Sequence, residues 1–284
     1  MQLGVFARIF ARSSVQEVFE VVASHGLRCV QFNLACAGLP TLPDEIEIGT
    51  MEGIRDAAAA RGIAIAAVSG TFNLIHPDPA QRSQGLSRLR VLIAACPHLG
   101  TNIITLCTGT RDPDDMWRWH SDNTSPEAWR DLTTSVGELV EIAGQLGVTL
   151  GLEPEPSNVI DTAQKARQLL DEISSPNLKI ILDAANLFHP GEVPRMKEIL
   201  DEAFDLLGGD IVLAHAKELG RDGRAGDLTL GTGVLDWGYY LALLRKVNFT
   251  GAVIMHGIQE KDVRASGTFL HAKLAQAGAA SEDG

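Results

Sequence analysis

Short apolar runs alternate with longer amphipathic runs along the whole chain, and this alternation constrains the fold more than any other feature. A buried parallel strand gives a short β-branched or apolar run, and the helix that covers it gives the longer one. The eight predicted strands are Leu3 to Phe6, Cys29 to Asn33, Ile63 to Val68, Asn102 to Leu106, Thr149 to Glu153, Leu178 to Leu182, Ile211 to His215 and Ala252 to His256. Eight repeats in 284 residues predict an α/β protein with a single (β/α)8 TIM barrel.

Helix boundary signals support this reading. The clearest predicted helix opens at Ser125-Pro126-Glu127, where Ser125 can cap the helix and Pro126 suits its first position. A second helix is predicted to run from Asp161 through Ile173 and to end near Pro176. No Ser/Gly-rich linker divides the chain, so we expect one barrel domain over residues 1–278 and a frayed C-terminal tail over residues 279–284.

The net charge and the composition of the chain limit the kinds of binding partner that we expect. A formal net charge of -12 opposes a nucleic-acid backbone, whose binding requires Lys and Arg, so nucleic acid is not an expected partner. No apolar run approaches the ~20 residues of a membrane span, and we expect a cytoplasmic protein that does not contact a membrane. The four cysteines show no CxxC pair and are expected to be reduced: Cys29, Cys36, Cys96 and Cys107.

Four consecutive predicted strands are apolar but end in an ionisable residue. These residues are Glu153, Asp183, His215 and His256. The C-terminal strand ends form the active face of such a barrel, and a lone ionisable group there is costly to bury unless it is paired or binds metal. Two carboxylates with one or two imidazoles suit Mn²⁺, Fe²⁺, Co²⁺ or Zn²⁺ better than Mg²⁺. The alternative is that each residue only anchors a loop by hydrogen bonds.

Two connections are longer than barrel closure requires. They run from Cys107 to Thr124 and from Leu219 to Leu235, after the fourth and seventh strands. Long loops in a compact barrel usually carry function, so we place both on the active face.

Several short segments resemble the sugar phosphate isomerase/epimerase superfamily of xylose isomerase-like barrels, over nearly the whole chain. The matching segments are Gly151-Leu152-Glu153-Pro154, Leu182-Asp183, His215-Ala216-Lys217-Glu218, Gly231-Thr232-Gly233 and Asp236-Trp237. The resemblance implies a divalent metal, usually Mn²⁺, held by Glu153, Asp183 and His215. It also implies a small sugar or polyol substrate and a homo-oligomer, a dimer or a tetramer.

The chain departs from the family pattern at two positions. His256 stands where the family usually has a strand-eight Glu, and Asn186 stands where it often has His. Because the family's epimerases use two opposed glutamates as bases, the first change argues against a symmetric mechanism. His256 is predicted either to ligate the metal or to serve as the second acid/base, since an imidazole titrates near pH 6.5.

The remaining candidates lie beyond the strand ends. Lys217 shares the inward parity of His215, so it can either stabilise an enediolate oxygen or form a salt bridge with Glu153 or Asp183. Glu153, His256 and Lys217 are the predicted catalytic residues. The predicted substrate-binding residues are His76, Asn33, Arg111, Glu155, Asn186 and Trp119. Trp119 and Arg111 belong to the first long loop and could cover the sugar, or Trp119 could only pack that loop.

These observations predict a metal-dependent isomerase or epimerase that transfers a proton through an enediolate. The closest alternative is a lyase, a dehydratase or β-eliminase of a keto-sugar or keto-glycoside, on the same metal site. A third alternative is a non-catalytic sugar-binding subunit. An apurinic-site endonuclease is disfavoured because the chain offers neither several His-rich metal sites nor a basic groove.

Overall fold

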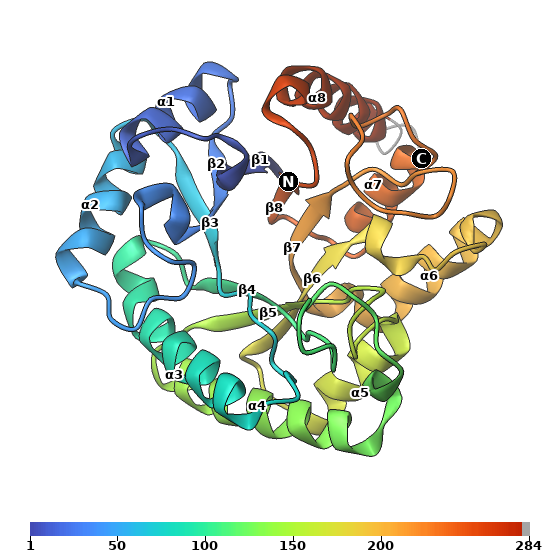
Figure 1. The fold of residues 1–284 in the computed structure, drawn as a ribbon. Coiled ribbons are helices and arrows are strands. Elements are labelled where there is room, and N and C mark those ends of the chain that lie inside the picture. Colours follow the sequence, from blue (N-terminus) through green and yellow to red (C-terminus); the bar gives the residue numbers. More distant parts are fainter. Residues whose placement is uncertain (280–284) are drawn as a thin grey trace.

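The computed structural model describes residues 1–279 and shows eight parallel strands closed into one barrel in the order β1 to β8. Figure 1 looks along this barrel, with the strands inside and the helices as an outer ring. The strands are β1 Gln2–Phe6, β2 Cys29–Phe32, β3 Ala64–Ser69, β4 Ile103–Cys107, β5 Thr149–Glu153, β6 Leu178–Asp183, β7 Ile211–Ala216 and β8 Ala252–Met255. The helices are α1 Val15–Ser24, α2 Ile48–Ala59, α3 Pro79–Ala95, α4 Pro126–Gln145, α5 Ala163–Ile173, α6 Met196–Leu207, α7 Trp237–Lys246 and α8 Val263–Ala279.

The predicted barrel is therefore confirmed, and each predicted strand overlaps an observed one with ends that differ by one residue at most. The predicted tail, apart from Ala279, lies outside the described residues, and the domain boundary at 278 stays a prediction. No helix among residues 1–279 is long and apolar enough to cross a membrane. All four cysteines are free.

The N-cap residues explain where helices α4 and α5 begin. Ser125 Oγ accepts a hydrogen bond from Ala128 N at 3.1 Å, and Pro126 occupies the first turn of α4 as predicted. The helix predicted from Asp161 begins two residues later, at Ala163, because Thr162 is its N-cap and accepts from Lys165 N.

The barrel interior is closed by small and aliphatic side chains. Cys29, Ala67, Ile181, Leu213 and Ile254 form a cluster of their own inside the strands. Gly4 and Gly151 lie at the same level: a Cβ on Gly4 would lie 2.5 Å from Cys29 Sγ, and one on Gly151 would lie 2.4 Å from Ile181 Cδ1. This packed layer leaves no channel, so the chemistry must occur above it, at the C-terminal strand ends.

Candidate metal centre and active site

One layer of polar residues lies directly above the packed interior. Side chains of a strand alternate between two faces, so a residue two positions beyond an inward residue also points inward. Adding two to the interior positions gives Phe6, Gln31, Ser69, Glu153, Asp183, His215 and His256. The site is therefore a consequence of strand parity, and nearly every strand contributes to it.

Glu153, Asp183 and His215 form a buried cluster at the ends of β5, β6 and β7. His215 Nδ1 lies 3.1 Å from Glu153 Oε1 and 3.6 Å from Asp183 Oδ2. One potential ligand atom from each residue lies within 4.8 Å of the others. Asp183 and His215 are direct neighbours in the register of β6 and β7, which fixes their separation.

The cluster fits a divalent cation. Asp183 Oδ2 is buried without a well-aligned hydrogen bond from the described part of the chain, and it faces only cationic or ring-nitrogen neighbours, Lys217 Nζ at 2.9 Å and His215 Nδ1 at 3.6 Å. Two carboxylates and one imidazole form a donor set that suits Mn²⁺, Fe²⁺, Co²⁺ and Zn²⁺. The three residues that the resemblance implies as ligands are thus the three that the fold brings together.

Lys217 and Asn186 complete the polar contacts around this cluster. The Lys217 ammonium Nζ lies 2.9 Å from Asp183 Oδ2 and 3.9 Å from Glu153 Oε1. Asn186 accepts a hydrogen bond from Lys217 Nζ at 3.1 Å and donates one to Glu153 Oε1 at 2.8 Å. Of the two roles considered for Lys217, the salt bridge is present, and stabilisation of an oxyanion stays a prediction.

The pKa values show how strongly the buried carboxylates favour positive charge. Burial lowers the pKa of His215, but Glu153 and Asp183 outweigh it and raise that pKa to about 9. Burial likewise opposes the Lys217 ammonium, yet neighbouring carboxylates, Asp183 foremost, raise its pKa above the ordinary value. For Asp183, burial acts upward on the pKa, and Lys217 and His215 overcome it and lower that pKa. Burial, followed by the charge of Glu153, raises the pKa of Glu155 to about 8.

Gln31 orients the imidazole of His215 from the opposite side of the barrel. Its amide nitrogen donates to Ser69 Oγ and Thr105 Oγ1, each at 3.2 Å. The amide oxygen therefore faces His215 Nε2, at 2.8 Å, and accepts a hydrogen bond from the N–H group there. This arrangement directs Nδ1 of His215 toward the two carboxylates, where a metal ligand is required.

His256 lies beside the cluster and not in it. Its ring stacks on the His215 ring, with centroids 4.6 Å apart and planes 10° apart. On its other face it stacks on Phe6 at 4.8 Å. Burial, followed by the charges of His215 and Lys217, lowers the pKa of His256 well below its ordinary value. Because the three-residue cluster does not include it, the geometry favours the predicted acid/base role over metal ligation.

Two cavities open above the cluster, and they share Glu155. The inner cavity, of about 260 Å³, is bordered by Glu153, His256, Asn33 and Trp117. The outer cavity, of about 610 Å³, is bordered by Trp119 and Asn186. Both long loops reach these cavities, Cys107 to Thr124 through the two tryptophans and Leu219 to Leu235 through Gly223-Arg224-Ala225. Asn33 also accepts from Ala35 N and Thr41 Oγ1, so its oxygen is engaged within the chain.

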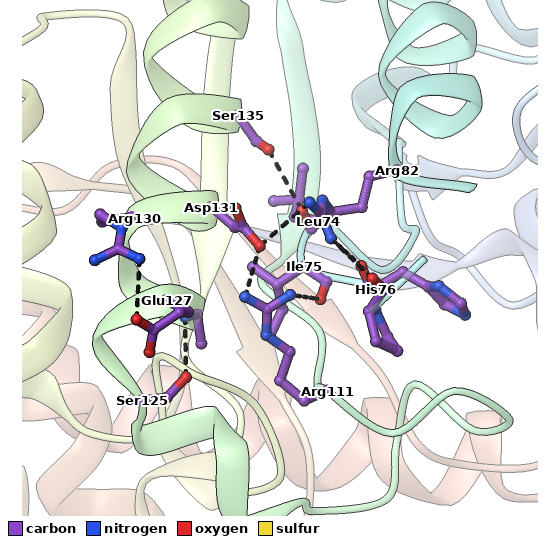
Figure 2. A network of polar contacts seen from close by, with 12 residues as sticks. Leu74, Ile75, His76, Arg82, Arg111, Ser125, Glu127, Arg130, Asp131 and Ser135 are labelled. Carbon is purple, nitrogen blue, oxygen red and sulfur yellow. Dashed lines mark hydrogen bonds and ion pairs between the residues drawn. The ribbon is translucent and has the colours of Figure 1, made fainter. Parts of the chain in front are cut away.

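Two predicted substrate-binding residues lie outside both cavities. Figure 2 shows Arg111 donating to Ile75 O at 3.0 Å and to Asp131 Oδ2 at 2.6 Å, between the β3 loop and α4. The His76 ring contacts Pro113 O at 3.0 Å and accepts from Asp78 N, which ties two loops together. The structure therefore places Arg111 and His76 as loop anchors.

Three residues of the site were not predicted in their present roles. Gln31 and Phe6 are absent from the catalytic, metal-binding and substrate-binding residues predicted from the sequence. Glu218 is fully buried and accepts from Gly231 N at 2.5 Å and from Trp237 Nε1 at 3.0 Å, so it holds the loop that follows β7. Strand parity would have found the first two, because both lie two residues beyond an interior position.

The fold and the site together define the class of protein. It is a closed (β/α)8 barrel with a candidate metal centre, formed by two carboxylates and a histidine at the ends of β5, β6 and β7. The family model for xylose isomerase-like TIM barrels matches residues 19–274. The chain belongs to this family.

Several proteins with sugar-epimerase names are similar to the chain. D-psicose 3-epimerase of Enterocloster bolteae is 33% identical over 122 residues, which cover 42% of this chain and 36% of that protein. The 3-keto-D-glucoside 4-epimerase of E. coli is 19% identical with a TM-score of 0.74, and the match covers 96% of this chain and 99% of that one. An L-ribulose 3-epimerase is 17% identical with a TM-score of 0.77, over 99% and 97% of the two chains. The likeness to the two solved structures is one of fold.

Proposed function

We propose that the chain is a divalent-metal-dependent isomerase or epimerase that acts on a small sugar, keto-sugar or polyol by an enediolate-type proton transfer. The observation that carries the proposal is the buried cluster of Glu153, Asp183 and His215 beside an inner cavity that Glu153 and His256 both line. The epimerase names of similar proteins support it. Mn²⁺ is the preferred ion, and Zn²⁺, Co²⁺, Fe²⁺ and Mg²⁺ are the alternatives. The cytoplasmic location and the dimer or tetramer stay predictions.

The proposed mechanism assigns a role to each residue of the site. Glu153, Asp183 and His215 would hold the ion, and a bound ion would supply Lewis-acid chemistry that makes a C–H beside the substrate oxygens more acidic. Glu153 takes the proton from that carbon. His256 relays a proton from solvent to another position, since it lines the inner cavity, its Nδ1 has no hydrogen-bond partner in the described residues, and its lowered pKa leaves the ring neutral and able to take that proton up; Glu153 releases its own proton to solvent. Lys217 borders neither cavity, so we assign it to charge stabilisation instead of proton transfer.

The first experiment measures metal content by mass spectrometry in the wild type, His215→Ala and His256→Ala. We expect the wild type to hold a stoichiometric divalent ion, His215→Ala to lose it, and His256→Ala to keep it because its ring lies beside the cluster. Loss in both variants would make His256 a ligand. A wild type that stays empty after addition of Mn²⁺ would exclude the proposed mechanism and favour the sugar-binding subunit.

A second experiment separates the isomerase from the lyase. A panel of ketoses and keto-glycosides is incubated with the enzyme in D₂O and followed by NMR and mass spectrometry. Isomerisation or epimerisation exchanges a carbon-bound proton for deuterium and keeps the skeleton, whereas elimination removes a hydroxyl or a glycosidic group. We expect exchange that is lost in Glu153→Gln. In His256→Gln, we expect it to fall by at least about a hundredfold, the low end for loss of a general acid or base.

A further inference from the structure

The two cavities share the loops after β4 and β5 but differ in their other walls. The outer cavity is completed by the loops after β6 and β7, and the inner cavity by β1, β2, β3 and β8 with the residues that follow them. The outer cavity is more than twice as large, about 610 Å³ against about 260 Å³. Ligand pockets span roughly 300–1,000 Å³. A free monosaccharide would occupy the inner cavity and leave the outer one unused.

The two cavities meet at the catalytic cluster. Glu155 lines both of them. Asn186 lines the outer cavity and also donates to Glu153 Oε1 at 2.8 Å, so one residue separates this cavity from the proposed base. A substituent attached to the reacting sugar can therefore pass from the inner cavity directly into the outer one.

The lining of the outer cavity suits a ring with flat apolar faces and polar edges. Trp119, Phe188 and Pro190 supply apolar surface, and Ser157, His189 and Arg224 supply hydrogen-bonding groups. Trp119 is 53% exposed, so much of its ring surface is accessible to a molecule in the outer cavity. Sugar rings and aromatic rings both pack a flat face on tryptophan.

One wall of this cavity is formed before any ligand binds. Leu219 and Ala225 form an antiparallel bridge, and Gly220 N donates to Arg224 O at 2.7 Å. Gly226 N donates to the main-chain oxygen of Glu218 at 2.8 Å, which fixes the base of this short hairpin next to β7. The hairpin carries Arg224, whose side chain is 87% exposed and pairs only loosely with Asp222, at 3.8 Å, on the same hairpin.

We propose that the substrate is a glycoside: a keto-sugar ring in the inner cavity that carries a second ring, a sugar or an aromatic group, packed on Trp119 in the outer cavity. This inference rests on the proposed function for the reaction, but its geometry can be tested without turnover. Simple glucosides have no ketone and cannot react, so their binding reports on the cavities alone.

The test measures binding by isothermal titration calorimetry. Methyl glucoside, phenyl glucoside and a glucose disaccharide are compared in both anomeric forms, with the full-length wild type, Trp119→Ala, Trp117→Ala and Leu146→Ala. Leu146 is the control because it is an exposed apolar residue at the C-terminal end of α4, at the opposite end of the barrel. Trp117 is the matched control for the inner cavity, since it is 51% exposed and belongs to the same loop as Trp119.

We expect at least one two-ring ligand to bind about tenfold or more tightly than methyl glucoside, as covering one aromatic face allows. Trp119→Ala should abolish this preference, and Leu146→Ala should keep it. Trp117→Ala should weaken all ligands alike. A binding preference confined to phenyl glucoside would identify the outer ring as aromatic, and one confined to the disaccharide would identify it as a sugar.

Equal affinities in the wild type, a preference that survives Trp119→Ala, or no binding of any glucoside would each overturn the glycoside proposal. The proposed function fails separately, when no ketose or keto-glycoside exchanges deuterium although the two-ring preference is present. The two failures are therefore distinguishable.

Discussion

His215 shows how one residue's surroundings define the site. The imidazole is held at both nitrogens, by the Gln31 amide oxygen at Nε2 and by the carboxylates of Glu153 and Asp183 at Nδ1. The metal-free ring is protonated at both nitrogens near pH 7, since its pKa is raised to about 9. A metal ligand, however, must be a neutral imidazole with one proton, and the amide acceptor places that proton on Nε2. The lone pair on Nδ1 is then directed at the carboxylates, an arrangement that a metal ion can use without any rotation of the ring.

Replacement of Gln31 tests this orientation. In Gln31→Leu the amide acceptor is lost, and we expect metal affinity to fall about 10–100-fold, as is typical when a partner of a metal-ligating His is removed. Gln31→Glu keeps an acceptor at the same place and should retain more of the affinity. Titration of the metal-free protein with Mn²⁺ measures both effects. Unchanged affinity in Gln31→Leu, with a folded protein by circular dichroism, would mean that Gln31 does not orient the ligand.

At the scale of elements, the strands and the strand-end residues could be predicted, whereas the loop side chains could be predicted only in part: Trp119 and Glu155 line the cavities, and Arg111 does not. The apolar strand pattern and the polar residue at each strand end located Glu153, Asp183 and His215, because a strand fixes both the depth and the direction of its side chains. Arg111 follows β4 by only a few residues, yet its side chain pairs with Asp131 on α4, away from the cavities. Where the Arg111 side chain points is determined only by the folded loop, because side-chain directions along a loop follow no fixed period.

Arg111 is therefore predicted to contribute to stability. Its side chain is 10% exposed and donates to both Asp131 and Ile75 O. Arg111→Ala should lower the free energy of unfolding by about 1–3 kcal/mol, because it leaves Ile75 O without its charged donor and leaves Asp131 with Arg82 as its one remaining partner. The control is Arg130→Ala, since the pair of Arg130 with Glu127 on the same helix is exposed and contributes about 0–1 kcal/mol. Urea denaturation measures both variants, and equal losses would contradict the anchoring role.

At the scale of the molecule, the site joins strands that are distant in sequence. Gln31 on β2 contacts His215 on β7 across the barrel, and Phe6 at the end of β1 stacks on His256 directly after β8. A ligand that binds only this assembled layer stabilises the whole folded state over the unfolded chain. Metal binding therefore raises the free energy of unfolding, and the protonation of the site residues changes the same free energy.

The metal-free protein is expected to lose stability as pH rises from 7 to 9. The pKa of His215 is raised from 6.5 to about 9, and that of Glu155 from 4.5 to about 8. A raised pKa means that the folded state holds the proton more tightly, so the contribution to stability is full below the ordinary pKa and is lost as pH rises through the folded value. His256 has a lowered pKa and titrates only in the more acid range.

Thermal denaturation in EDTA should therefore show a Tm that falls between pH 7 and 9, and the fall should be less steep in Glu155→Gln. Saturating Mn²⁺ should abolish the fall, because metal ligands bind in their deprotonated form. A Tm in EDTA that is constant or rises between pH 7 and 9 would show that these two groups are not protonated in the folded site.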